Sequence, residues 1–308
     1  MRIKTHILIL GATGYIGSNL YKELLNQNTG NIHFHILIRN KQSNLKSTLN
    51  TTVYIGDLKS FNWKGLDHFP DIVYHLARIN STKGKILGRK YASYTGKKAN
   101  QKLINYLKSE KVKVQLFYLS GSLMYGNSKQ EINEKNSLNP ISFAKQYITA
   151  EKPFLNHNNV TSNLNVCMVR VPWVLGNGSW FKAFYLNYIS KTNTIPLYGR
   201  GANIMSFITL KDLSKCLVGL QNVDFKDSIN LTYNESITQM QFSELIKKSV
   251  SLNINTIQLK NNFEKVIIDA FECNIDFKTI YKEFDSILKN KTVKDKITNE
   301  LDFIFKDK

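Results

Sequence analysis

The sequence predicts an α/β fold in which a doubly wound parallel sheet is followed by a smaller C-terminal lobe. The first observation is an apolar run at residues 7–10 that ends at Gly11, with Gly14 and Gly17 following at three-residue intervals. The second is the amphipathic, helix-like segment at residues 18–25. The third is the alternation of helical segments with further apolar, β-favouring runs, at residues 32–38, 52–55, 71–75 and 114–119. Strands separated by helices indicate right-handed crossovers and a parallel, Rossmann-type sheet.

The glycine triplet has the spacing of a dinucleotide-binding turn. Gly11 would permit the tight turn, Gly14 the close approach of a pyrophosphate, and Gly17 the packing of the helix against the sheet. The pyrophosphate would then lie on the free N–H groups of the helix N-terminus. The alternative, a glycine-rich turn without a ligand, does not account for the strand before the triplet and the helix after it.

Composition excludes several classes of protein. The 308 residues are 42% hydrophobic and 21% charged, as in an ordinary globular protein, and no apolar run approaches the roughly 20 residues of a membrane span. The first strand starts almost at the N-terminus, so we expect no signal peptide and a cytoplasmic location. Cys167, Cys216 and Cys273 have no metal-ligand spacing, which favours buried thiols in a reducing compartment and no metal site.

The net charge of +19 has three interpretations: a nucleic-acid partner, attraction of an anionic substrate, or a lysine-rich surface without a specific role. The lysines are dispersed along the chain and form no basic block interleaved with aromatic residues. We therefore expect no nucleic-acid partner and favour the lysine-rich surface, with a nucleotide-bearing small molecule as the alternative.

The end of the second strand bears on the choice between NAD(H) and NADP(H). An acidic residue there accepts a hydrogen bond from the ribose 2′-hydroxyl, whereas an arginine pairs with a 2′-phosphate. Arg39, with Lys41 close by in the sequence, favours NADP(H). A solvent-exposed arginine without a ligand is the alternative.

Motifs along the chain resemble those of the extended short-chain dehydrogenase/reductases, in the NAD(P)-dependent epimerase/dehydratase group. They are Gly11–Gly17, Gly56–Leu58, His75–Ala77, Tyr118–Gly126, Val169–Pro172 with Gly176–Gly178, Gly199–Gly201 and Phe207–Leu213. The resemblance covers residues 1 to about 250. With the glycine motif and Arg39, it implies coenzyme contacts at Gly11, Thr13, Gly14, Tyr15, Ile16, Gly17, Arg39, Asp57, Leu58, Leu76, Ala77, Tyr147, Val171 and Pro172.

We expect a coenzyme-binding domain at residues 1–175 and a mainly C-terminal substrate lobe at residues 176–308, with segments that return to the sheet. In this lobe Thr238 and Gln241 have the spacing of a capping box. Apolar periodicity predicts further helices at residues 275–287 and 297–305. The substrate would occupy the cleft between the sheet and this lobe.

The resemblance implies catalysis by a tyrosine and a lysine four residues later, which share one helix face. The matching segment is residues 139–152, and two registers are open. Anchored on Ala150 and Glu151, Phe143 takes the tyrosine position and Tyr147 the lysine position; this is the register we prefer. Anchored on Tyr147 as the acid, Glu151 takes the lysine position. Neither register supplies the lysine.

The family serine is also displaced. Its usual position falls on Gly121, and Ser122 is the neighbouring substitute. The acidic pair of the nucleotide-sugar 4,6-dehydratases is absent, since Ser122 and Leu123 stand there. The candidate catalytic residues are therefore Tyr147, Tyr125 and Ser122.

Two functions remain open. The first is an NAD(P)-binding epimerase or reductase with a non-standard catalytic site, acting on a nucleotide sugar or a similar polar carbonyl or hydroxyl metabolite. The second is a catalytically inactive dinucleotide-binding sensor, subunit or scaffold. We expect a small-molecule substrate and no membrane partner, and the formation of a homodimer is left open.

Overall fold

A seven-stranded sheet runs through the first of two compact units. This unit comprises Met1–Ser120, Lys145–Val169 and Leu217–Ile229, and the second comprises Gly121–Ala144, Arg170–Cys216 and Asn230–Lys308. The computed structural model describes residues 4–28, 30–39, 44–79, 86–157, 163–223, 227–250, 254–259 and 265–306.

The order of the strands is that of a doubly wound sheet, β11-β7-β5-β4-β1-β2-β3. Its strands are β1 (Thr5–Leu10), β2 (Ile32–Ile38), β3 (Thr51–Ile55), β4 (Ile72–His75), β5 (Val114–Gly121), β7 (Leu164–Val171) and β11 (Asp227–Asn230). The pairs β1–β2, β2–β3, β1–β4 and β4–β5 are parallel. Leu10 at the end of β1 is in register with Leu37 of β2 and His75 of β4. The carboxyl ends of these three strands therefore meet at one edge of the sheet.

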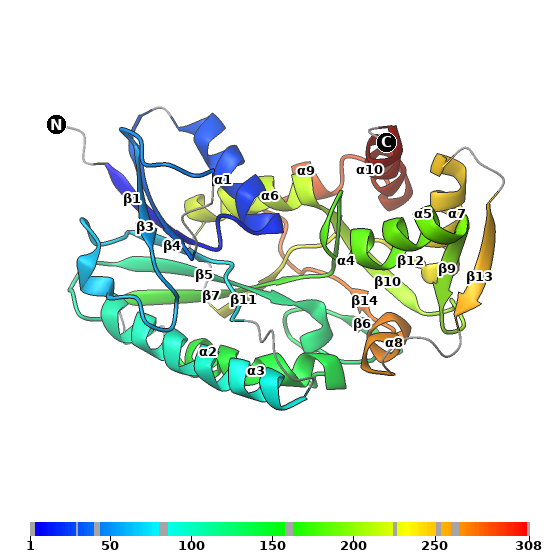
Figure 1. Cartoon of the computed structure of the whole chain (residues 1–308), viewed down its shortest axis with the longest axis horizontal. Helices are drawn as coiled ribbons and strands as arrows, with labels where there is room; N and C mark the ends of the chain where they lie inside the picture. The colour runs from blue at the N-terminus through cyan, green and yellow to red at the C-terminus, as the bar shows by residue number, and fades with distance from the viewer. Residues whose placement is uncertain are drawn as a thin grey trace. The chain divides into compact units, whose positions relative to one another are not determined.

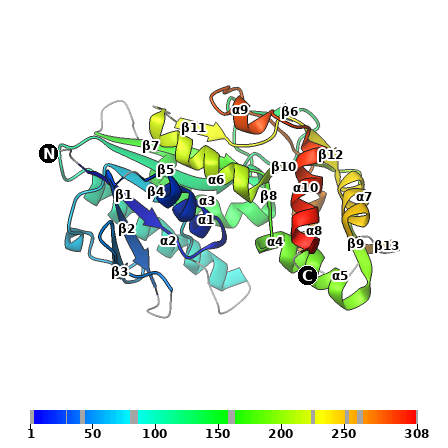
Figure 2. The same ribbon diagram turned by 90° about the horizontal axis from the view of Figure 1, so that it is seen from above.

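Helices cover both faces of this sheet (Figures 1 and 2). On one face lies α1 (Tyr15–Gln27), which buries Leu20 and Leu24. On the other face lie α2 (Ile86–Leu107) and α3 (Ser142–Leu155), where Leu103 of α2 and Phe154 of α3 join the core beneath β1, β4 and β5. Two short 3₁₀ helices complete the unit, η1 (Trp63–Gly65) and η4 (Leu220–Asn222). The predicted doubly wound α/β fold is confirmed.

The second unit contains three small sheets, with strand orders β12-β10-β8, β13-β9 and β14-β6. Its strands are β6 (Glu131–Ile132), β8 (Trp173–Leu175), β9 (Thr194–Tyr198), β10 (Ile204–Thr209), β12 (Ser236–Thr238), β13 (Asn255–Leu259) and β14 (Asp276–Phe277). Its helical segments are η2 (Ser122–Met124), α4 (Ser179–Phe181), η3 (Lys182–Leu186), α5 (Asn187–Thr192), α6 (Leu210–Gly219), α7 (Gln239–Val250), α8 (Lys265–Glu272), α9 (Asp285–Leu288) and α10 (Val293–Lys306).

Two of the three local predictions for the C-terminal part are confirmed. The N–H of Gln241 donates to Thr238 Oγ1 at 3.1 Å and the N–H of Thr238 donates to Gln241 Oε1 at 2.9 Å, which is a capping box at the start of α7. Helix α10 replaces the predicted terminal helix, with Ile297, Leu301 and Ile304 buried.

The helix predicted over residues 275–287 is wrong. Residues 276–277 form β14 beside β6, and only Asp285–Leu288 are helical. The reason lies in the backbone partners of this segment. The N–H of Ile275 bonds to the carbonyl of Ile204 and the N–H of Phe277 to Ser206 Oγ, and these partners fix an extended conformation. The two apolar residues alternate with period two, which the helical pattern concealed.

Among the described residues, no helix is both long and apolar enough to cross a bilayer. The three cysteines are buried thiols without disulfides, as the sequence predicted.

Candidate functional site

The turn between β1 and α1 is built so that only glycine fits at two of its positions. Gly11 has a φ of +95°, and a Cβ on it would lie 2.9 Å from the backbone nitrogen of Ala77. A Cβ on Gly17 would lie 2.1 Å from the carbonyl oxygen of Gly11. The first turn of α1 therefore packs directly on the glycine turn, and the first N–H groups of the helix are brought to the carboxyl end of β1.

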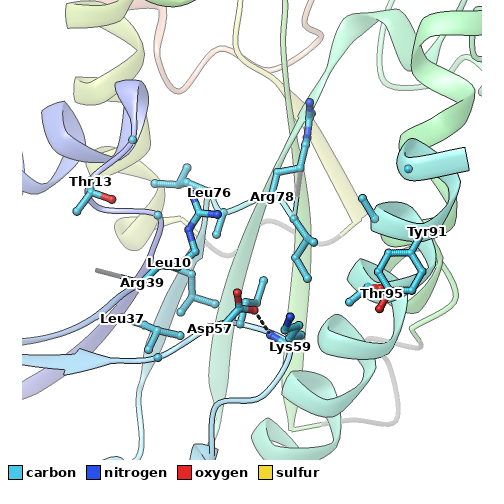
Figure 3. Close-up of a pocket in the computed structure, with 18 residues that line it drawn as sticks. Leu10, Thr13, Leu37, Arg39, Asp57, Lys59, Leu76, Arg78, Tyr91 and Thr95 are labelled. Carbon is cyan, nitrogen blue, oxygen red and sulfur yellow. Dashed lines mark hydrogen bonds between the residues drawn. The ribbon is translucent and has the colours of Figure 1, made fainter. Parts of the chain in front are cut away.

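A cavity of about 630 Å³ opens at this edge of the sheet (Figure 3). Its walls come from the ends of β1, β2, β3 and β4 and from the start of α2, through Leu10, Gly11, Thr13, Gly14, Leu37, Arg39, Gly56, Asp57, Leu58, Lys59, Leu76, Ala77, Arg78, Ile79, Gly88, Tyr91, Ala92 and Thr95. Its size is in the range of ligand sites. Ligands of doubly wound sheets bind at this edge, outside the carboxyl ends of the strands.

The cavity carries more positive than negative side chains. Arg39 follows β2, Lys59 follows β3 and Arg78 follows β4, whereas Asp57 is the single carboxylate among the lining residues. The N–H of Lys59 donates to Asp57 Oδ1 at 3.0 Å, which holds this carboxylate at the turn after β3. Lys41, which the sequence placed with Arg39, lies outside the described residues. The balance of charge suits a ligand with several phosphate oxygens.

A second cavity, of about 320 Å³, shares five lining residues with the first, namely Leu58, Ala77, Arg78, Ile79 and Ala92. Tyr147 of α3 lines it. The guanidinium carbon of Arg78 lies 3.8 Å from the centroid of the Tyr147 ring, which is the geometry of a cation–π contact. The cation beside Tyr147 is therefore an arginine from the end of β4.

Buried polar contacts support this second cavity from the α2 and α3 side. Ser120 Oγ donates to Glu151 Oε1 at 2.6 Å, and both side chains are buried. His75 Nε2 bonds to Asn100 Oδ1 at 2.9 Å, and Asn100 Nδ2 donates to the carbonyl of Ala150 at 2.8 Å. Burial lowers the pKa of His75 to about 4, so this imidazole is neutral at neutral pH. These contacts tie β4, β5 and α2 to α3 at the turn that follows Tyr147.

The other candidate catalytic residues belong to the second unit. Gly121 is the last residue of β5, and a Cβ on it would lie 3.9 Å from the carbonyl oxygen of Val171, an ordinary contact. Ser122 begins η2 and is buried. The hydroxyl of Tyr125 donates to Asn230 Oδ1 at 3.1 Å, and the guanidinium carbon of Arg170 lies 5.5 Å from the Tyr125 ring centroid. Phe143 lies in the first turn of α3, one turn before Tyr147.

The structure therefore brings most of the predicted coenzyme contacts to one place. The first cavity gathers Gly11, Thr13, Gly14, Arg39, Asp57, Leu58, Leu76 and Ala77. Tyr15, Ile16 and Gly17 form the first turn of α1 behind the glycine turn. Val171 ends β7 and Pro172 follows it, both in the second unit. Within the described ranges, no three His, Cys, Asp or Glu side chains are arranged to hold a metal ion.

Sequence analysis missed Arg78, Lys59 and the cavity-facing residues of α2. The signal for Arg78 and Lys59 was their place in the chain, since each directly follows a motif that ends a strand, His75–Ala77 and Gly56–Leu58. The residues of α2 have no such signal, because the loop that brings the helix to the cavity has no motif of its own.

The sequence matches the profile of the NAD dependent epimerase/dehydratase family over residues 7–233. The chain belongs to this family. A curated relative in the epimerase/dehydratase family is described as an uncharacterized UDP-glucose epimerase, YtcB, of Bacillus subtilis (strain 168). It is 27% identical over 159 residues, an alignment that covers 47% of this chain and 49% of the relative. The chain thus spans about half the length of this relative in that alignment.

Solved structures of epimerases share the fold over nearly the whole chain. A UDP-N-acetylglucosamine 4-epimerase from Methanobrevibacter ruminantium M1, in complex with UDP-N-acetylmuramic acid, has a TM-score of 0.77 at 21% identity, covering 99% of this chain and 98% of its own. A UDP-glucuronic acid 4-epimerase from Bacillus cereus, in complex with UDP-glucuronic acid and NAD, also has a TM-score of 0.77, at 18% identity and with 99% and 100% coverage. MoeE5 in complex with UDP-glucose and NAD has a TM-score of 0.75 at 18% identity, with 98% and 99% coverage.

Proposed function

We propose that this member of the epimerase/dehydratase family binds NADP(H) and alters a carbonyl or hydroxyl centre of a nucleotide sugar or a similar polar metabolite. The observation that carries the proposal is the glycine turn, in which a Cβ at Gly11 or Gly17 would collide with backbone atoms beneath a cavity at the carboxyl ends of β1 to β4. A dinucleotide needs this close approach of backbone N–H groups to its pyrophosphate.

The residues of the cavity fit the two ends of such a coenzyme. The pyrophosphate would lie on the turn at Gly11–Gly14 and the start of α1. The adenosine half would lie over β2 and β3, where Arg39 suits a 2′-phosphate and Asp57 suits a hydrogen-bonding group of the adenine. No acidic residue stands in the place of Arg39, which is why we propose NADP(H) rather than NAD(H).

When bound, the nicotinamide would supply or accept the hydride, and the chain itself would handle the proton. Tyr147 is the proposed proton donor because its ring lines the second cavity beside Arg78. Ser122 is the proposed hydrogen-bond partner of the substrate oxygen. Tyr125 is the weaker acid candidate, since its hydroxyl already donates to Asn230.

The absent lysine supports a second candidate function, a dinucleotide-binding protein that transfers no hydride. Neither register of residues 139–152 places a lysine four residues after a tyrosine. Such a protein would bind the same coenzyme as a sensor, subunit or scaffold.

Mass spectrometry of the purified protein, followed by turnover assays, tests the proposal and separates the two candidates. We expect co-purified or titratable nicotinamide dinucleotide, and a change in nicotinamide absorbance or in the sugar itself with at least one member of a nucleotide-sugar panel. Tyr147→Phe should lower that turnover while leaving coenzyme binding intact. Coenzyme binding without any turnover across the panel would favour the non-catalytic candidate, and the absence of binding would exclude both.

A further inference from the structure

Arg78 places a permanent positive charge at the junction of the two cavities. It lines both of them, and it follows β4 in the sequence, directly after Ala77. Its guanidinium carbon lies 3.8 Å from the centroid of the Tyr147 ring, so the stack on α3 holds a side chain that would otherwise be free in solvent. A guanidinium stays protonated at any working pH.

The position of Arg78 differs from that of the other cations of the first cavity. Strand β1 lies between β2 and β4 in the sheet. Arg39 and Lys59 stand on the β2–β3 side of the glycine turn, and Arg78 stands on the β4 side. A dinucleotide centred on the glycine turn would extend one nucleoside to each side. On the proposed function, Arg39 and Lys59 would therefore serve the adenosine half, and Arg78 would stand at the nicotinamide half.

This placement has a chemical consequence that the other cations do not share. The oxidised nicotinamide ring carries a positive charge and the reduced ring is neutral, whereas the phosphates of the two forms are the same. A cation beside the phosphates attracts both forms equally. A cation beside the ring repels only the oxidised form.

We propose that Arg78 makes this site selective for the reduced coenzyme. The inference rests on the proposed function and goes further, because it sets which redox form the protein takes up from a mixed pool. It also makes Tyr147 a positioning residue for Arg78, through the face of its ring and independently of its hydroxyl.

Equilibrium binding measures this selectivity without any substrate. The fluorescence of NADPH gives its affinity, and displacement of NADPH by NADP⁺ gives that of the oxidised form. We expect the wild-type protein to bind NADPH about three- to tenfold more tightly than NADP⁺ at low salt, with a smaller ratio at high salt because the charge is partly exposed to solvent. Arg78→Gln should bring the ratio close to one, and Arg78→Lys should retain it.

Two control variants separate charge from general damage. Lys59→Gln removes a cation of the same cavity on the adenosine side, so it should weaken both forms equally and leave the ratio unchanged. Tyr147→Phe keeps the aromatic face and should retain the ratio, whereas Tyr147→Leu should reduce it. Circular dichroism and the melting temperature establish that each variant is folded.

The outcomes distinguish this inference from the proposed function. A wild-type ratio of one, or a ratio that Arg78→Gln leaves unchanged while both forms bind, would overturn the selectivity and leave the coenzyme site standing. Binding of neither form by the folded protein would overturn both.

Discussion

The carbonyl oxygen of Gly11 occupies the space that the side chain of any other residue at Gly17 would need. The distance from this oxygen to a Cβ on Gly17 would be 2.1 Å, and the atom it meets belongs to the backbone. The contact cannot be relieved by a side-chain rotation. It makes the glycine turn and the start of α1 one rigid feature, at the place where we propose that the pyrophosphate binds.

We therefore expect Gly17→Ala to lower the free energy of unfolding by about 1–3 kcal/mol and to abolish or strongly weaken coenzyme binding. Urea denaturation followed by circular dichroism measures the first effect, and NADPH titration the second. Gly65→Ala is the matched control, because a Cβ there meets no atom within 4 Å. If the two variants behave alike, the packing of the turn is not the constraint that the structure indicates.

A second prediction concerns four histidines gathered at the opposite end of the strands from the cavity. His6 of β1 is in register with His33 of β2, and its ring centroid lies 4.4 Å from that of His68 and 5.3 Å from that of His35. His6 Nδ1 and His35 Nε2 share a hydrogen bond of 3.0 Å, and His35 Nδ1 bonds to the hydroxyl of Tyr54. Four imidazoles this close cannot all carry a charge.

Burial, together with the neighbouring imidazoles, lowers the pKa of this cluster. The pKa of His35 falls to about 4, and those of His6 and His33 are also lowered. Lys4 adds to this effect at His6 and His33, and Asp67 and Asp71 partly oppose it. Because an unfolded histidine titrates near 6.5, the unfolded chain binds more protons below this pH. Stability should therefore be lost as the pH falls from about 6.5 towards 4.

Unfolding free energies measured by urea denaturation between pH 7.5 and 4.5 test this sign. His35→Leu removes the most buried imidazole, so its stability should depend less steeply on pH over that window, although it loses two hydrogen bonds. His157→Gln is the control outside the cluster. Parallel pH profiles for the wild-type protein and His35→Leu would contradict the prediction.

A third prediction has the opposite sign and belongs to the second unit. Burial raises the pKa of Glu300 to about 7, with a further contribution from the charge of Asp212, which Lys211 opposes. The folded state therefore binds a proton here that the unfolded state releases above about 4.5. This group's contribution to stability is present below pH 4.5 and is lost as the pH rises through 7.

Glu300→Gln replaces the carboxyl by a neutral group of the same shape. We expect the variant to gain stability relative to the wild-type protein at pH 8 and to show little difference at pH 5. Melting temperatures at the two pH values measure this, with Glu283→Gln as a control whose difference from the wild type should not change with pH. An equal shift at both values for Glu300→Gln would show that the carboxyl does not titrate in this range.

A fourth prediction tests the preferred register of α3. Gly121→Ser, Phe143→Tyr and Tyr147→Lys together restore the family pattern, and the space at Gly121 accepts a side chain without collision. Because a lysine at 147 would stand against the guanidinium of Arg78, the combination should include Arg78→Gln. We expect an increase in turnover, followed by nicotinamide absorbance with nucleotide sugars. A folded quadruple variant that binds coenzyme but gains no turnover would count against this register.

The sequence predicted those features that depend on neighbouring residues. The strand, glycine turn and helix at residues 7–25 follow from local pattern, and so does the capping box at Thr238. The pattern failed at residues 275–287, where hydrogen bonds to the backbone of Ile204 and to Ser206 decide the conformation.

Contacts between distant segments were not predictable in this way. The stack of Arg78 on Tyr147 joins residues 69 positions apart, and its members come from a loop after β4 and from α3. The histidine cluster joins two strands and a loop. A single sequence shows such residues only as a charge or a ring, and their partners depend on the register and order of the strands.

The most direct test of the central claim is calorimetric titration of the wild-type protein and of Gly17→Ala with NADPH. The account predicts saturable one-to-one binding to the wild-type protein and little or no heat with the variant. The folded wild-type protein giving no binding of either nicotinamide dinucleotide would contradict it.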